Sequence, residues 1–200
     1  MPFLDFAAHV AAIRPELDAA IARVLDSGWF ILGPEGEAFE RELAAALGAK
    51  HAVGVANGTE ALQLALTALG VGPGDEVVTS PLSAAFSALA ILSAGARPVF
   101  ADIDPVTLNL SPDAVVRAVT PRTKAIVPVH LYGHPVDMDP ILDLAAARGI
   151  AVLEDACQAI GALYKGRPVG TLRGLGALSF YPTKNLGALG DGGAILVDDA

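Results

Sequence analysis

Short apolar runs that alternate with helical segments restrict this chain to few folds. Five runs rich in valine, isoleucine and other strand-forming residues lie between residues 53 and 153, and segments with helical spacing separate them. The expected strands are Val53–Val55, Glu76–Thr79, Pro98–Phe100, Ala125–Val129, Ile150–Leu153 and, later, Ala194–Val197. The expected helices between them are Thr59–Leu69, Ser83–Ala94, Pro112–Val119 and Asp139–Arg148. This alternation is typical of an α/β domain with a mostly parallel sheet that helices cover on both faces.

Two helices are expected before the first strand. Apolar residues recur on one helical face from about His9 to Ser27, and a second helix is predicted from Glu35 to Leu47, ending at Gly48. We assign residues 1–30 to an N-terminal helical segment and residues 31–200 to the large domain that contains the sheet.

Composition argues against several classes of function. Thirteen basic residues against 22 acidic ones give a net charge of −9, which disfavours nonspecific binding to nucleic acid or to an anionic membrane. Cys157 is the single cysteine, so no intrachain disulfide is possible and a reducing compartment is expected. The longest apolar stretch, around Ala84 to Ala96, is too short to span a bilayer, and Met1–Asp5 lacks the basic residues of a signal peptide. We therefore expect a cytoplasmic protein.

Polar residues follow the first expected strand, at the edge where open α/β sheets bind ligands. Asn57, Gly58 and Thr59 open a helix there, so their backbone N–H groups and the Thr59 hydroxyl are suited to receive a phosphate. An ordinary helix cap by Asn57 or Thr59, with Glu60 in the first turn, explains the same residues. The two interpretations are compatible.

Two more polar residues stand at expected strand ends. Asp155 comes just after the apolar strand Ile150–Leu153, where a carboxylate needs a partner or water. A structural salt bridge would satisfy it as well as a ligand would. Ser179 ends the strand-like run before a glycine-rich turn, and a half-buried strand serine bonded to backbone is its simplest interpretation.

Lys184 lies between that strand and the glycine-rich turn, about thirty residues after Asp155. A lysine becomes a nucleophile when partial desolvation or a neighbouring cation lowers its pKa. Pyridoxal 5'-phosphate requires both groups, a lysine that forms a Schiff base and a carboxylate that keeps the pyridine nitrogen protonated. A solvated lysine in a mobile loop is the alternative interpretation.

These segments resemble a known family. From Ser27 to its end the chain resembles the DegT/DnrJ/EryC1/StrS family of sugar-nucleotide aminotransferases, which use pyridoxal phosphate on an aspartate-aminotransferase-like fold (fold type I). The matching stretches are Ser27–Glu35, Asn57–Leu62, His130–Ile141, Glu154–Ala159 and Ser179–Gly193. The resemblance implies amino transfer from an amino acid, with glutamate as the expected donor, to a nucleotide-linked keto-deoxysugar. It also implies a homodimer when the protein is full length.

The resemblance assigns roles to individual residues. Lys184 matches the Schiff-base lysine that also moves protons, and Asp155 matches the partner of the pyridine nitrogen. Gln158 matches a glutamine beside the phenolic oxygen of the cofactor. The residues that match phosphate contacts are Gly58, Thr59 and Ser179. The resemblance implies no metal site.

The chain departs from the family where an aromatic residue usually stacks on the cofactor ring. Ala84 occupies that position, and Phe86 follows two positions later. Either Phe86 takes over the stacking or the stacking is lost. Residues two apart on a helix point in nearly opposite directions, so replacement by Phe86 requires a local change of backbone.

Other functions remain to be compared with amino transfer. Family members continue beyond the end of this chain, so we expect residues 31–200 to be an incomplete cofactor-binding domain without the C-terminal small domain. A noncatalytic or inactive cofactor-binding fragment is therefore one alternative. A metal-dependent glycosyltransferase that uses Asp102 and Asp104 is another. Related dehydratases carry histidine in place of Lys184, which disfavours that chemistry here.

Overall fold

Helices and strands alternate as the sequence predicts in the computed structural model, which describes residues 5–198. The expectations for Met1–Leu4 and for residues 199–200 lie outside these described residues. The helices are α1 (Phe6–Ala12), α2 (Arg14–Ser27), α3 (Pro34–Leu47), α4 (Gly58–Ala68), α5 (Phe86–Ser93), α6 (Pro112–Ala118) and α7 (Met138–Arg148), with a 3-10 turn η1 at Leu131–Gly133. The strands are β1 (His51–Val55), β2 (Glu76–Thr79), β3 (Arg97–Phe100), β4 (Thr123–Val127), β5 (Ala151–Val152), β6 (Glu154–Asp155), β7 (Leu163–Tyr164), β8 (Arg167–Pro168), β9 (Leu175–Ser179) and β10 (Gly193–Val197).

Two sets of strands make up the main sheet. One has the order β3-β2-β4-β5 and is parallel throughout, and the other has the order β6-β9-β10-β1. Asp155 in β6 joins the two sets, because its amide donates to the Pro128 carbonyl at 2.9 Å and its carbonyl accepts from the His130 amide at 3.1 Å. Strand β10 runs antiparallel to both β9 and β1, whereas β6 and β9 are parallel. The prediction of a mostly parallel sheet is therefore confirmed.

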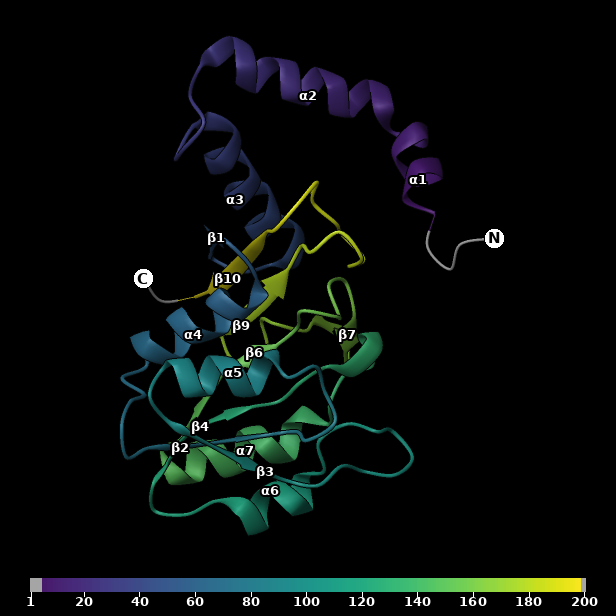
Figure 1. Ribbon diagram of the computed structural model, residues 1–200. Coiled ribbons are helices and arrows are strands. Elements are labelled where there is room, and N and C mark those ends of the chain that lie inside the picture. The colour runs from purple at the N-terminus through teal and green to yellow at the C-terminus, as the bar shows by residue number, and fades with distance from the viewer. Residues whose placement is uncertain (1–4, 199–200) are drawn as a thin grey trace.

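Helices cover both faces of this sheet (Figure 1). Helices α4 and α5 pack with alternate strand residues, such as Val77, Val127 and Ala177, in one buried cluster. Helices α3, α6 and α7 pack on the other face, where Val78 and Leu178 point. Adjacent residues of one strand thus enter different clusters, as the period of two in a strand requires.

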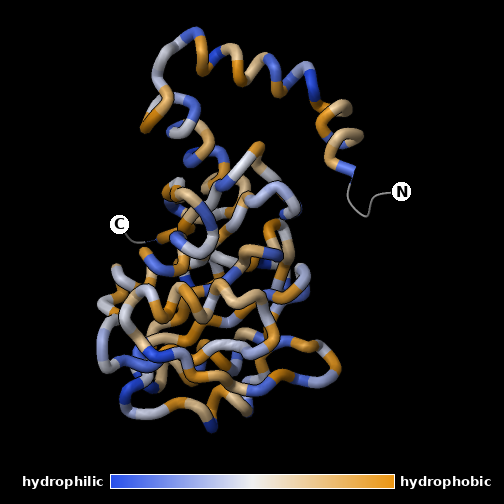
Figure 2. The backbone as a smooth tube through the Cα atoms, viewed as in Figure 1, coloured by the Kyte–Doolittle hydropathy of each residue, from blue (hydrophilic) through white to orange (hydrophobic). Residues whose placement is uncertain are grey.

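The N-terminal segment differs from its prediction. The prediction of one helical stretch from about His9 to Ser27 is wrong, because α1 ends at Ala12 and α2 begins at Arg14. Pro15 stands in the first turn of α2, where its missing N–H costs nothing, but its ring blocks continuation of the preceding helix. Apolar residues recur along both helices (Figure 2), yet none of their residues is buried. No helix within residues 5–198 has the length and apolar character that a membrane span requires.

Candidate active site

The residues singled out from the sequence come together in one cavity of about 930 Å³. It lies at the carboxyl ends of β1, β6 and β9 and at the start of α4 and α5. All six predicted site residues line it: Gly58, Thr59, Asp155, Gln158, Ser179 and Lys184. Their convergence follows from the fold, since parallel strands end at the same edge of the sheet.

The turn after β1 is a helix cap that lines the cavity. Asn57 Oδ1 accepts from the Glu60 amide at 2.9 Å, and Glu60 Oε2 accepts from the Ala56 amide at 2.7 Å. The capping interpretation is thus confirmed. The Thr59 hydroxyl makes no hydrogen bond to any residue in the described range 5–198. The first N–H groups of a helix lack intrahelical partners and attract anions, so the cap and a phosphate site remain compatible.

Gly58 allows α4 to approach the sheet closely. A Cβ at this position would lie 2.7 Å from Cys157 Sγ and 2.8 Å from Ser179 Cβ. Any side chain would therefore force the start of α4 away from β9 and from the turn after β6. The glycine brings the start of α4 against Ser179, so the first amides of α4 and the Ser179 hydroxyl form a cradle of hydrogen-bond donors.

Asp155 is a buried carboxylate that faces the cavity, with 5% of its surface exposed. Its Oδ2 accepts from Ser87 Oγ at 2.7 Å, and its Oδ1 accepts from the Cys157 amide at 3.2 Å. Within residues 5–198 no lysine, arginine or histidine forms an ion pair with it, so the salt bridge considered from the sequence is not formed. A buried carboxylate without a cation is costly, and a cationic group of a ligand would offset that cost.

Lys184 is half-buried in the loop between β9 and β10, rather than fully solvated. Its amide donates to the Tyr181 carbonyl at 2.8 Å, and across the described chain its ammonium has no ion-pair partner. Burial raises the pKa of the Cys157 thiol, the Asp155 carboxylate raises it further, and the Lys184 ammonium opposes both. The ammonium and the carboxylate therefore both lie within electrostatic range of this thiol.

Gln158 and Ser179 complete the predicted set. Gln158 Oε1 accepts from the Tyr132 amide at 3.1 Å, which ties the residue to the η1 turn. Ser179 is half-buried at the end of β9, and its Oγ accepts from the Tyr181 amide at 3.4 Å. The simple interpretation of Ser179 as a strand serine bonded to backbone is confirmed. Its hydroxyl proton remains available to a ligand in the cradle.

Ala84 and Phe86 both line the cavity, and Phe86 is 58% exposed. The helix α5 begins only at Phe86, three residues later than predicted, and Ala84 precedes it. Ala85, which lies between them, has helical backbone angles (φ −58°, ψ −10°), so the expectation that the two side chains point in nearly opposite directions stays a prediction. The angles at Ala85 do not show the local change of backbone that replacement by Phe86 requires, so stacking by Phe86 also stays a prediction.

The cavity also contains residues that sequence reasoning missed, notably Ser87, Cys157 and Asp191. A detectable signal existed for Ser87, since it is one of two hydroxyl residues in the otherwise apolar helix α5. A polar side chain on a buried helical face needs a partner, and that requirement marks it as a candidate.

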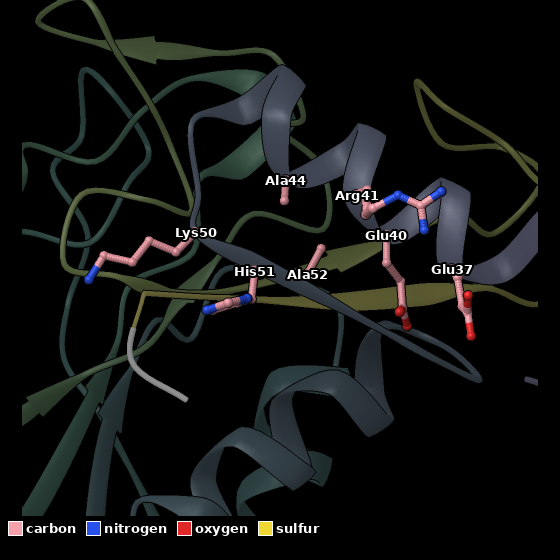
Figure 3. Close-up of a pocket in the computed structure, with 7 residues that line it drawn as sticks. All are labelled: Glu37, Glu40, Arg41, Ala44, Lys50, His51 and Ala52. Atoms are coloured by element: carbon pink, nitrogen blue, oxygen red, sulfur yellow. The ribbon is translucent and has the colours of Figure 1, made fainter.

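A smaller cavity of about 270 Å³ between α3 and β1 has a different character (Figure 3). Charged residues line it, with Lys50 at one end and Glu37 at the other, and none of the predicted site residues does. Glu40 Oε1 accepts from the Gly54 amide at 2.7 Å. Because β1 is an edge strand, this bond satisfies a backbone N–H that would otherwise be open to pairing, and we assign the contact to stability.

Asp102 and Asp104, the residues of the metal-dependent alternative, shape a turn. Asp104 Oδ1 accepts from the amides of Val106 and Thr107, and these bonds lower the pKa of its carboxyl. Asp102 Oδ1 accepts from the Ile103 amide. Among residues 5–198 no group of three or more His, Cys, Asp or Glu side chains is arranged to hold a metal ion.

Comparison with known proteins extends this description. The model of the DegT/DnrJ/EryC1/StrS aminotransferase family matches residues 11–200. A dTDP-3-amino-3,4,6-trideoxy-alpha-D-glucose transaminase of Streptomyces venezuelae is 52% identical over 199 residues, which cover 100% of this chain and 52% of the relative. The chain spans about half the length of the curated relatives it matches.

Solved structures agree with the sequence comparison. The crystal structure of S. venezuelae DesV matches with a TM-score of 0.97 and 52% identity, over 99% of this chain and 53% of that one. The structure of NtdA from Bacillus subtilis, with bound cofactor PMP, matches with a TM-score of 0.93 and 37% identity, over 100% of this chain and 45% of that one. These likenesses confirm the expected α/β fold of the aspartate-aminotransferase type. The chain belongs to the DegT/DnrJ/EryC1/StrS aminotransferase family.

Proposed function

We propose that this chain carries the cofactor site of an aminotransferase that moves an amino group from an amino acid to a nucleotide-linked keto-sugar. The observation that supports it best is the pairing of a buried, cation-free Asp155 with the half-buried Lys184 in one cavity. The names of related proteins, a dTDP-sugar transaminase and a UDP-sugar aminotransferase, support a sugar nucleotide as acceptor. Glutamate as donor, a homodimeric full-length protein and a cytoplasmic location belong to the same proposal.

The residues present fit pyridoxal 5'-phosphate at its charged groups. The amides at the start of α4 and the hydroxyls of Thr59 and Ser179 suit the phosphate, because they form a cradle that the absence of a side chain at Gly58 leaves open. Asp155 suits the protonated pyridine nitrogen, and Gln158 suits the edge of the ring. When bound, the cofactor supplies an electron sink for the charge that develops at the α-carbon of the amino donor.

Lys184 is the residue in the cavity suited to move the proton. As a free amine, its Nζ would take a proton from the α-carbon of the donor and would return it to the cofactor carbon bonded to the donor nitrogen. Asp155 would hold the protonated pyridine nitrogen of the cofactor in the cavity that it shares with Lys184. Burial raises the pKa of the Cys157 thiol and keeps it protonated, so it adds no competing negative charge beside Lys184.

The test is an absorbance titration with pyridoxal phosphate, followed by addition of glutamate. We expect a visible band that is absent in Lys184→Ala and changes when glutamate is added. Lys124→Ala is the matched control, because Lys124 is exposed on β4 and does not line the cavity. It should behave as the wild type.

Each other outcome has a defined meaning. A folded protein without a Lys184-dependent band refutes the proposal. A Lys184-dependent band that does not respond to any amino donor identifies a noncatalytic cofactor binder instead. Once the donor reaction is established, a panel of nucleotide-linked 3-keto and 4-keto sugars tests the acceptor.

A further inference from the structure

Helix α5 brings a single buried hydroxyl to the key carboxylate of the cavity. Ser87 is 3% exposed, and its Oγ donates to Asp155 Oδ2 at 2.7 Å. The residues are 68 positions apart in the sequence, so the fold rather than a local turn creates the contact. A buried hydroxyl needs a hydrogen-bond partner, and within the described residues Asp155 is the one that Ser87 has.

The two oxygens of Asp155 are held in different ways. Oδ1 accepts from the Cys157 amide, which belongs to the same turn and moves with the aspartate backbone. Oδ2 accepts from Ser87, which belongs to another element. Rotation of the carboxylate about the Cβ–Cγ bond of Asp155 would break both hydrogen bonds. Each oxygen retains a further acceptor site for a ligand, since an ionised carboxylate accepts about four hydrogen bonds.

Helix α5 also forms part of the cavity wall, through Phe86 and Leu89. These side chains are 58% and 47% exposed, whereas Ser87 between them is buried. The Ser87 hydroxyl therefore connects α5, which forms the cavity wall, to the Asp155 carboxylate. In the proposed site, that carboxylate would accept the N–H of the cofactor ring. A shift of α5 would change both contacts at once.

We propose that Ser87 is a positioning residue of the amino-transfer site, which fixes the Asp155 carboxylate in the orientation that receives the protonated ring nitrogen of the cofactor. This inference rests on the proposed function. It differs from a purely structural role, in which the hydroxyl only satisfies its own burial. A structural role alters the stability of the cofactor-free protein and leaves cofactor affinity and its pH dependence unchanged.

The experiment compares Ser87→Ala with Ser87→Thr, which retains the hydroxyl. Ser80→Ala is the matched control, because Ser80 is also buried but its hydroxyl donates to the Leu82 carbonyl at 3.2 Å, away from the cavity. The measurements are affinity for pyridoxal phosphate, the pH dependence of the bound absorbance and thermal unfolding without cofactor. Unfolding separates loss of structure from loss of positioning.

We expect Ser87→Ala to bind pyridoxal phosphate about tenfold more weakly, because a hydrogen bond to a charged group is lost. The pH dependence of its bound absorbance should move as well, while Ser87→Thr and Ser80→Ala stay close to the wild type. If Ser87→Ala does not fold, Ser87→Cys carries the test, since it keeps the size of the side chain and weakens the donor. Its affinity should then fall by a smaller factor.

Two results would overturn the inference, and they are distinguishable. If the wild type shows a Lys184-dependent band and the folded Ser87 variants match it in affinity and pH dependence, Ser87 has only a structural role. If the wild type shows no such band, the proposed function fails first, and the positioning role fails with it.

Discussion

Replacing Gly58 by alanine tests the closest approach in the site. The new Cβ would lie 2.7 Å from Cys157 Sγ and 2.8 Å from Ser179 Cβ, where ordinary contact begins at 3.4 Å. It would thus be about 0.7 Å too close to the first atom and about 0.6 Å too close to the second. Ser179 Cβ is fixed by the backbone, so rotation of a side chain cannot relieve that contact, although rotation of Cys157 would relieve the other. Overpacking of this kind costs about 1–3 kcal/mol.

The start of α4 must move to accept the methyl group, and its amides move with it. We therefore expect Gly58→Ala to lower the free energy of unfolding by about 1–3 kcal/mol. We also expect the affinity for pyridoxal phosphate to fall by more than tenfold, which corresponds to a loss of more than about 1.4 kcal/mol of binding free energy. Denaturant unfolding followed by circular dichroism measures the first quantity, and absorbance titration measures the second.

Gly36→Ala is the matched control. Gly36 also lies in the first turn of a helix, α3, but a Cβ there would meet nothing within 4 Å. It should leave the protein as stable as the wild type, or more stable by up to about 1 kcal/mol. Adding Cys157→Ala to Gly58→Ala removes one of the two clashing atoms and should recover part of the loss. If Gly58→Ala is as stable and binds as well as Gly36→Ala, the close-contact argument is wrong.

Two further predictions concern single side chains. Thr59→Val should weaken binding of pyridoxal phosphate without lowering the unfolding free energy, because the hydroxyl has no partner within residues 5–198; equal affinity would exclude Thr59 from the phosphate cradle. Hydrogen bonds from Thr120, Arg122 and Arg97 lower the pKa of Glu76 from 4.5 to about 2. The contribution of the ionised Glu76 to the free energy of unfolding is therefore complete above pH 4.5 and is lost as the pH falls toward 2. Denaturant unfolding at pH 7 and pH 3 should show a smaller loss of stability on acidification in Glu76→Gln than in the wild type.

The sheet was predictable because its pattern is local. Short runs of valine and isoleucine predict β2 and β4, and the helical spacing of apolar residues predicts the helices around them. The break near Ile13 was missed because helical spacing continues across it, although Pro15 already marks the place. The late start of α5 was missed because Ser83 to Ala85 has no distinct turn signal.

The candidate site was predictable to a different extent. Strand ends place Asp155 and Ser179 at one edge of the sheet, but the roles assigned to them came from the resemblance to a family. The contact between Ser87 and Asp155 joins residues 68 positions apart, and the approach of Gly58 to Cys157 is also long-range. Contacts of this kind depend on how helices pack on the sheet, and no local pattern contains that information.

The position of β10 has a consequence for how the protein folds during synthesis. Strand β1 is made early, but its partner in the sheet is β10, more than one hundred residues later. Until β10 leaves the ribosome, β1 has no paired strand, β9 is open on one side, and α4 packs on a sheet that is still incomplete. Closing this long loop is entropically costly, so we expect a slow step in which β10 inserts between its two neighbours.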